Sequence, residues 1–316
     1  MAFLPGGRRQ MLSRIAESLF WIGRYVDRAD NTARLLDLHF NVLLEDPWVD
    51  EPTANASLLQ VMHCEYEGEV TRDVVLELLA YDPERASSIA GTLTAARENA
   101  RRAREVISTE VWESLNTTRQ QLVSRSRTRR PYTYFEWVRE RAAVVWGLSG
   151  ATTSRDDTWL FMDLGRSIER ADMIARLLMT RSLAGTIGAN WTTLLRSCAA
   201  HEAYLRRVRS LVSEERAAEF LLIDRMFPRS IAFNLHRAER ILTELDPDAP
   251  RRSASTQARF ALGRARSDLE YRQVREILDD LPARMQDVQV ACAEASDLIS
   301  ERFFQPATTV WTQEAV

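Results

Sequence analysis

The feature that most constrains this chain lies in residues 13–44, where apolar or small side chains recur at alternating intervals of four and three residues. Those side chains are Ile15, Leu19, Ile22, Val26, Ala29, Ala33, Leu36, Phe40 and Leu43. The intervals are those of a long α-helix with one continuous buried face. A second row of small and charged residues runs beside that face, at Gly23, Asp27, Asp30 and Arg34. We therefore expect this helix to lie at the centre of the fold, with its charges partly enclosed.

Much of the stretch recurs 142 residues later in the chain. Residues 23–36, GRYVDRADNTARLL, and residues 165–178, GRSIERADMIARLL, are identical at nine of fourteen positions. The second copy also repeats the charged row, at Gly165, Glu169, Asp172 and Arg176. This repetition predicts an internally duplicated bundle in which segments 13–44 and 156–181 are related by a pseudo-twofold axis. The alternative is that similar charged helices simply recur in an arginine-rich protein.

The rest of the chain also has the helical period, and no segment shows the sustained β-branched alternation of a strand. The sequence therefore predicts an all-α, multi-helix bundle that forms a single domain over residues 1–316. Further helices are predicted at 54–65, 71–80, 86–106, 109–124, 132–147, 158–181, within 191–211, and at 214–226, 229–245, 257–281 and 283–304. Loops are expected at 124–131, 147–157 and 185–188, and a polar linker at 246–255.

The two charged rows and their neighbouring arginines form the main candidate site. Its members are Arg24, Asp27, Arg28, Asp30, Arg34, Arg166, Glu169, Arg170, Asp172 and Arg176. If the copies face each other, four carboxylates meet guanidinium groups inside a bundle, where they could bind a divalent cation or hold a charged substrate. In the alternative, which we favour, acids and arginines only pair with one another. Each copy has an acid followed four residues later by an arginine, the favourable order on a helix, and the pairs Arg24–Asp27 and Arg166–Glu169 each lie within one turn.

A second candidate group surrounds the FPRS segment and consists of Arg225, Arg229 and Asn234. Pro228 at the start of a predicted helix leaves nearby backbone N–H groups free, and such groups can bind an anion. The alternative is an ordinary helix start with a solvated arginine.

The composition excludes several classes of chemistry. All 42 basic residues are arginine, so the lysine of a P-loop and the Schiff-base lysine of pyridoxal phosphate enzymes are both missing. No Glu-x-x-His or His-x-x-x-His spacing occurs around the four histidines, which argues against di-iron and helical zinc sites. We therefore expect no metal and no cofactor. The net charge of −3 does not favour a nucleic-acid partner.

The cysteines and the amino terminus bear on the compartment. Cys64, Cys198 and Cys292 are far apart, which fits neither a disulfide framework nor a zinc knuckle, so we expect a reducing, cytoplasmic setting. A nucleophilic cysteine with a distant histidine stays open, Cys198 near His201 being one candidate. The amino-terminal apolar residues are interrupted by charges, so neither a signal peptide nor a membrane span is expected.

Four segments carry a resemblance to a known family. They are SRIAESLFWIGRYVDRADNTARLL, ENARRAREVISTEVWESLN, GRSIERADMIARLL and LLIDRMFPRSIAFNL. Together they resemble the bacterial alpha-E family, a helical domain with a Glu-Arg motif, over most of the chain. The second copy keeps that motif as Glu169-Arg170, whereas the first has Asp27-Arg28, whose acid is shorter.

The resemblance implies partners and no particular reaction. Alpha-E proteins are associated by gene neighbourhood or fusion with circularly permuted ATP-grasp proteins and transglutaminase-like peptidases, so a cytoplasmic peptide-ligation or protein-modification system is the implied setting. Two hypotheses follow: an accessory scaffold beside such a ligase, which we favour, or an enzyme that uses the duplicated acid–arginine rows. A homo-oligomer is left open in both.

Overall fold

The computed structural model describes residues 11–45, 49–127, 130–183, 190–209 and 212–305, and within them the chain is helical without a strand. This confirms the predicted all-α class. Two π-helical turns, Glu77–Tyr81 and Ser300–Phe304, accompany the α-helices. The α-helices are α1 (Ser13–Glu45), α2 (Glu51–Val61), α3 (Arg72–Leu76), α4 (Ile89–Arg102), α5 (Thr109–Arg127), α6 (Pro131–Thr152), α7 (Asp157–Leu183), α8 (Trp191–Ser197), α9 (His201–Val208), α10 (Glu214–Ile223), α11 (Ile231–Leu245), α12 (Ala254–Tyr271), α13 (Val274–Asp279) and α14 (Leu281–Ile299).

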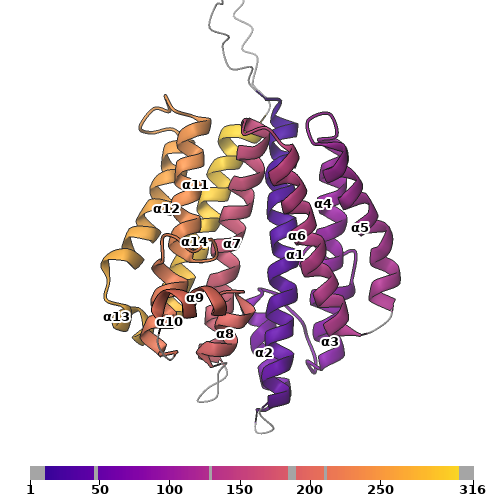
Figure 1. Cartoon of the computed structure of the whole chain (residues 1–316), viewed down its shortest axis with the longest axis vertical. Helices are drawn as coiled ribbons and strands as arrows, with labels where there is room; N and C mark the ends of the chain where they lie inside the picture. The colour runs from indigo at the N-terminus through magenta and orange to yellow at the C-terminus, as the bar shows by residue number, and fades with distance from the viewer. Residues whose placement is uncertain (1–10, 46–48, 128–129, 184–189, 210–211, 306–316) are drawn as a thin grey trace, which may run out of the picture.

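Helices α1 and α7 form the central pair of the molecule (Figure 1). On one side α1 packs against α4 and α6, both of which contact α5. On the other side α7 packs against α11 and α14, both of which contact α12. The structure therefore consists of two four-helix groups with the same pairing pattern, joined along α1 and α7. The shorter helices α2, α3, α8, α9 and α10 lie toward the lower end in Figure 1.

The crossing of α1 and α7 depends on two glycines in equivalent positions. A Cβ atom on Gly23 would lie closer than 3.0 Å to the carbonyl oxygen of Met162, and one on Gly165 would lie equally close to that of Phe20. Real Cβ atoms essentially never come so near another atom. Since Phe20 and Met162 are themselves 142 positions apart, the contact is reciprocal. Only the absence of a side chain lets the two backbones approach this closely.

The same reciprocity extends to the helix caps. Ser88 caps α4 and donates a hydrogen bond to the carbonyl oxygen of Asp82, and Ser230 caps α11 and donates to that of Asp224. Ser88 and Ser230 are 142 positions apart, and so are Asp82 and Asp224. The two halves thus share local geometry well beyond the central helices. That they descend from one duplicated unit stays a prediction.

Several predicted boundaries were wrong, and backbone hydrogen bonding explains them. The predicted break at 147–157 begins too early, because α6 runs through Gly147 and Gly150 to Thr152. The predicted 86–106 helix is shorter at both ends, since α4 begins at Ile89 behind its Ser88 cap and ends at Arg102. Helix α5 continues to Arg127 inside the predicted 124–131 loop, while the 185–188 loop lies outside the described residues. The predicted 257–281 helix is divided into α12 and α13.

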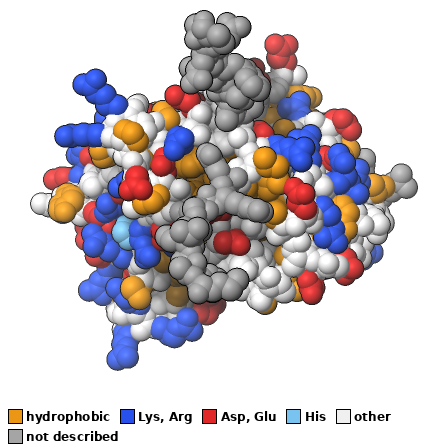
Figure 2. Space-filling model, turned by 90° about the horizontal axis from the view of Figure 1, so that it is seen from above, with side chains coloured by type: hydrophobic (Ala, Val, Ile, Leu, Met, Phe, Trp, Pro, Cys, Tyr) orange, Lys and Arg blue, Asp and Glu red, His pale blue; other side chains and the backbone are white. Residues whose placement is uncertain are grey.

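The surface carries charges of both signs. Seen from above, acidic and basic side chains are interspersed with hydrophobic ones over the described residues (Figure 2). No helix within the described ranges is long and apolar enough to cross a membrane.

Candidate functional site

Glu169 lies at the centre of the α1–α7 interface and is fully buried. Its carboxylate accepts hydrogen bonds from two arginines of the other central helix. Arg24 Nε donates at 2.6 Å, and Arg28 donates through Nε at 2.5 Å and Nη2 at 2.9 Å. Such a forked contact between guanidinium and carboxylate is the strongest form of a charged hydrogen bond. Glu169 therefore ties α7 to two successive turns of α1.

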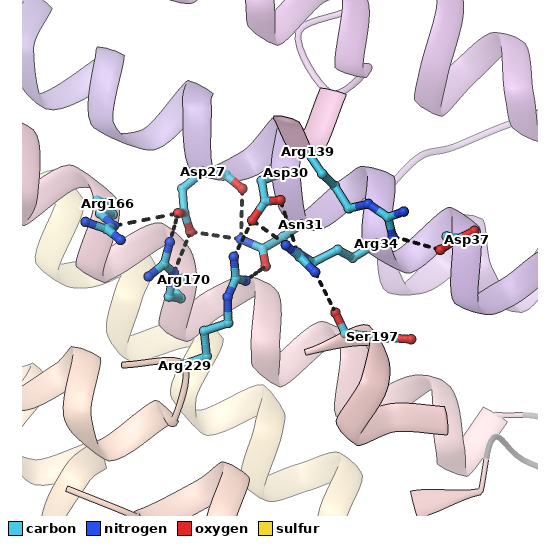
Figure 3. A network of polar contacts seen from close by, with 10 residues as sticks. All are labelled: Asp27, Asp30, Asn31, Arg34, Asp37, Arg139, Arg166, Arg170, Ser197 and Arg229. Carbon is cyan, nitrogen blue, oxygen red and sulfur yellow. Dashed lines mark hydrogen bonds and ion pairs between the residues drawn. The ribbon is translucent and has the colours of Figure 1, made fainter. Parts of the chain in front are cut away.

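Asp27 occupies the equivalent position on α1 and is also fully buried. Arg170 of α7 donates to both of its carboxylate oxygens, through Nε at 3.1 Å and through Nη2 (Figure 3). Asn31 adds a hydrogen bond from Nδ2 at 2.8 Å. Arg166 Nε stays 4.0 Å away. The acid of each helix is thus held by arginines of the other helix.

This arrangement corrects the predicted pairing of Arg24 with Asp27 and of Arg166 with Glu169 within one turn. The pairs form between helices because the glycine crossing brings each acid within reach of the other helix's arginines. Sequence spacing shows which residues share a helix face, and it does not show what that face meets.

The outer acids form the predicted pairs within each helix. Arg34 Nε lies 3.0 Å from Asp30, and Arg176 Nε lies 2.8 Å from Asp172. Each arginine also caps the carboxyl end of a short helix in the other half of the chain. Arg34 donates to the carbonyl oxygen of Ser197 in α8 at 3.3 Å, and Arg176 donates to that of Val61 in α2 at 2.6 Å. Cationic side chains are favourable at such helix carboxyl ends. These pairs therefore fix α8 and α2 against the central helices.

The second candidate group does not stay together. Arg229 joins the central network, where it donates to Asp30 and, at 3.0 Å, to Asn31. Asn234 instead donates to the carbonyl oxygens of Pro228 and Ser230. Arg225 is exposed and forms a forked pair with Glu270. The prediction of a helix start at Pro228 with free N–H groups was also wrong. Helix α11 begins at Ile231, and the Ser230 hydroxyl caps it by accepting a hydrogen bond from the Phe233 N–H.

Opposite charges keep Glu169 and Asp30 ionised. Burial by itself raises the pKa of Glu169, but Arg28 and Arg24 outweigh it and lower that pKa to about 2. Burial likewise raises the pKa of Asp30, and Arg229 and Arg34 lower it to about 2. At neutral pH neither carboxyl group has a proton to give. The carboxylate oxygens of both residues already accept hydrogen bonds from arginines.

These shifts predict a loss of stability in acid. A carboxyl group whose pKa is lower in the folded state stabilises that state above its unfolded pKa, and the stabilisation is lost as pH falls toward the folded pKa. For Glu169 the ordinary and folded pKa values are 4.5 and about 2, and for Asp30 they are 3.8 and about 2. We expect the urea midpoint to fall steeply between these values. A midpoint unchanged down to pH 2 would contradict the network.

A second prediction compares Arg34→Met with Arg176→Met. Asp30 keeps Arg229 when Arg34 is removed, so only a charged hydrogen bond is lost, at about 1.5–3 kcal/mol. Within the described residues Asp172 has Arg176 as its ion-pair partner, so Arg176→Met leaves a buried carboxylate without that partner, at about 3–5 kcal/mol. Urea denaturation of both variants gives the comparison. Equal losses, or losses near the ~0.3–0.5 kcal/mol of an exposed pair, would show that the rows face water.

Other candidate groups have no geometry for catalysis. Burial raises the pKa of the Cys198 thiol to about 12 and also raises the pKa of Cys292, so both stay protonated. His201 Nδ1 lies 3.9 Å from the carboxylate of its neighbour Glu202, and Cys198 is fully buried. No group of three or more histidine, cysteine, aspartate or glutamate side chains in the described ranges is placed to hold a metal ion.

Comparison with known proteins finds one matching family and several relatives. The model of the Alpha-E family, "a predicted alpha-helical domain with a conserved ER motif", matches residues 11–304. An uncharacterized protein of Mycobacterium bovis and two of Mycobacterium tuberculosis are each 25% identical over 268 residues. Each match covers 73% of this chain and 30% of the relative, so the chain spans less than a third of these proteins. No solved structure matches.

Proposed function

The chain belongs to the Alpha-E family, and we propose that it is a helical accessory module without a reaction of its own, acting beside an ATP-grasp peptide ligase and a transglutaminase-like peptidase in the cytoplasm. The observation that carries the first part is the closure of the central network. Asp27, Asp30, Glu169 and Asp172 each have an arginine partner. A general base or metal ligand needs a carboxylate with a free lone pair and access to substrate. In this network the acids hold helices together instead.

The partner assignment rests on the family resemblance, and two observations support it. The region shared with the mycobacterial relatives is only 30% of their length, so in those proteins it is one part of a much longer chain. A region that is one part of a longer protein fits the proposed role of an accessory module. The chain also has no lysine, which suits a division of labour in which the ligase supplies the nucleotide site.

Co-purification tests the proposal. The tagged chain is expressed together with the products of its neighbouring genes and isolated with and without ATP. We expect the ATP-grasp ligase to be retained in at least one condition. Elution of the chain alone in both conditions would overturn the partner assignment.

A variant separates the scaffold from the enzyme hypothesis. Asp30→Asn removes one charge of the closed network and should change ligation only as far as it changes folding. If the variant melts like the wild type and yet abolishes ligation in the reconstituted system, the acid row is a functional site and the proposal is wrong.

A further inference from the structure

Two arginines in equivalent positions of the repeat have different surroundings. Arg24 donates to Glu169 at 2.6 Å and to the Ser296 hydroxyl of α14 at 2.5 Å, and its side chain is 9% exposed. Arg166 has its nearest carboxylate oxygen, on Asp27, at 4.0 Å, and its side chain is 27% exposed. Within the described residues Arg166 donates no hydrogen bond. In Figure 3 it lies at the end of the network, on the far side of Asp27 from Asp30.

The difference has two causes in the sequence. Asp27 is one methylene shorter than Glu169, so with Arg170 bound it does not reach Arg166. In place of Ser296 of α14, helix α6 presents Trp146, on whose ring the Arg166 guanidinium stacks at 4.3 Å. The indole Nε1 of Trp146 is buried and has no hydrogen-bond partner. Arg166 is therefore a partly exposed cation that stacks on a tryptophan ring and donates no hydrogen bond within the described residues.

The side chains around the α1–α7 crossing carry more positive than negative charges. Four carboxylates, on Asp27, Asp30, Glu169 and Asp172, are enclosed with seven arginines, namely Arg24, Arg28, Arg34, Arg166, Arg170, Arg176 and Arg229. The chain as a whole is negative, at −3. Asp163, the other acid near Arg166, is engaged by Arg237 at 2.8 Å. Burial and the neighbouring Arg170 lower the pKa of Arg166 to about 10, so it is charged at neutral pH.

We propose that Arg166 binds a carboxylate group from solution, which takes on Arg166 the place that the Glu169 carboxylate takes on Arg24. The pseudo-twofold relation supplies the chemistry, because the equivalent arginine is already satisfied by a carboxylate. A guanidinium matches the two oxygens of such a group in one plane. The partial exposure of Arg166 gives the ligand access. The inference is independent of the proposed function.

Acetate serves as the probe, titrated into the full chain against chloride at constant ionic strength. Binding is followed by isothermal titration and by tryptophan fluorescence, which Trp146 should report. We expect saturable acetate binding that chloride does not reproduce. Arg166→Gln should weaken it at least about tenfold, because one charged hydrogen bond contributes that much. Trp146→Phe should remove the fluorescence change, because Trp146 is the tryptophan on which Arg166 stacks.

Two further variants make the test specific. Asp27→Glu introduces the longer acid that the other half has at the equivalent position. Its carboxylate should then pair with Arg166, so acetate binding is lost while the protein stays folded. Arg155→Gln is the matched control, since Arg155 also stacks on a tryptophan, Trp159, at 3.8 Å but is exposed. It should bind acetate like the wild type.

Three results would overturn the proposal. One is the absence of saturable acetate binding to the wild-type chain. Another is unchanged binding in Arg166→Gln with a native circular dichroism spectrum, which decides the matter even if Asp27→Glu fails to fold. The third is tighter binding of inorganic phosphate than of acetate, lost in the same variants, which would contradict a carboxylate ligand.

Discussion

Glu169→Gln is expected to lower the free energy of unfolding by about 3–5 kcal/mol, although the two side chains have nearly the same size. Glu169 is fully buried and receives three hydrogen bonds from Arg24 and Arg28. An amide in its place leaves two enclosed guanidinium groups without a counter-charge. It also turns an N–H₂ group toward donors, where no hydrogen bond can form.

Urea denaturation followed by circular dichroism measures this loss. The control is Glu98→Gln, because Glu98 pairs with Arg101 at the surface, where its side chain is 39% exposed. An exposed pair is worth about 0–1 kcal/mol, so the control should unfold close to the wild type. Similar losses in both variants would mean that the Glu169 contacts are not the source of stability.

Gly23→Ala and Gly165→Ala are each expected to cost about 3 kcal/mol or more. The added methyl group meets a backbone carbonyl oxygen of the facing central helix closer than 3.0 Å. Backbone cannot rotate away as a side chain can, so α1 and α7 must move apart and every contact between them lengthens. Overpacking commonly costs about 1–3 kcal/mol, and more when the backbone has to move.

A glycine elsewhere in the chain supplies a control in which the same substitution should raise the stability. A Cβ atom on Gly147 of α6 meets nothing within 4 Å, so Gly147→Ala should stabilise by about 0.5–1 kcal/mol through helix propensity. The double variant of Gly23 and Gly165 should lose less than the sum of the single losses, because one displacement of the helices relieves both clashes. A neutral Gly23→Ala would show that the helices are not in contact there.

The fold class and the central helix could be predicted from the sequence because they depend on local patterns. Alternating intervals of four and three residues describe one helix face whatever that face contacts, and α1 spans Ser13–Glu45, close to the predicted 13–44. The i,i+4 pairs of Asp30 with Arg34 and of Asp172 with Arg176 are local in the same sense. Whether these residues form a functional site stays a prediction.

What could not be predicted depends on contacts between distant segments. Glu169 could pair with Arg166 on its own helix or with arginines of another helix, and only the Gly23–Gly165 approach decides. Arg229 lies just before a helix cap, and nothing in its neighbours indicates that it bonds to Asp30, which lies 199 positions earlier. Helix α6 continues through its two glycines to Thr152, where the Thr153 N–H still donates to the carbonyl oxygen of Ser149 at 3.1 Å.

The exchange of charges across the central pair has a consequence for synthesis on the ribosome. Arg24 finds its acid 145 positions later in the chain, and Arg28 finds the same acid 141 positions later. At about 5–20 residues per second, the first helix emerges roughly 7–30 s before its counter-charge exists. During that interval the nascent first half has a continuous apolar face and two arginines without a partner. Its order of folding is therefore set by translation: the amino-terminal half completes its core only when the second central helix has left the exit tunnel.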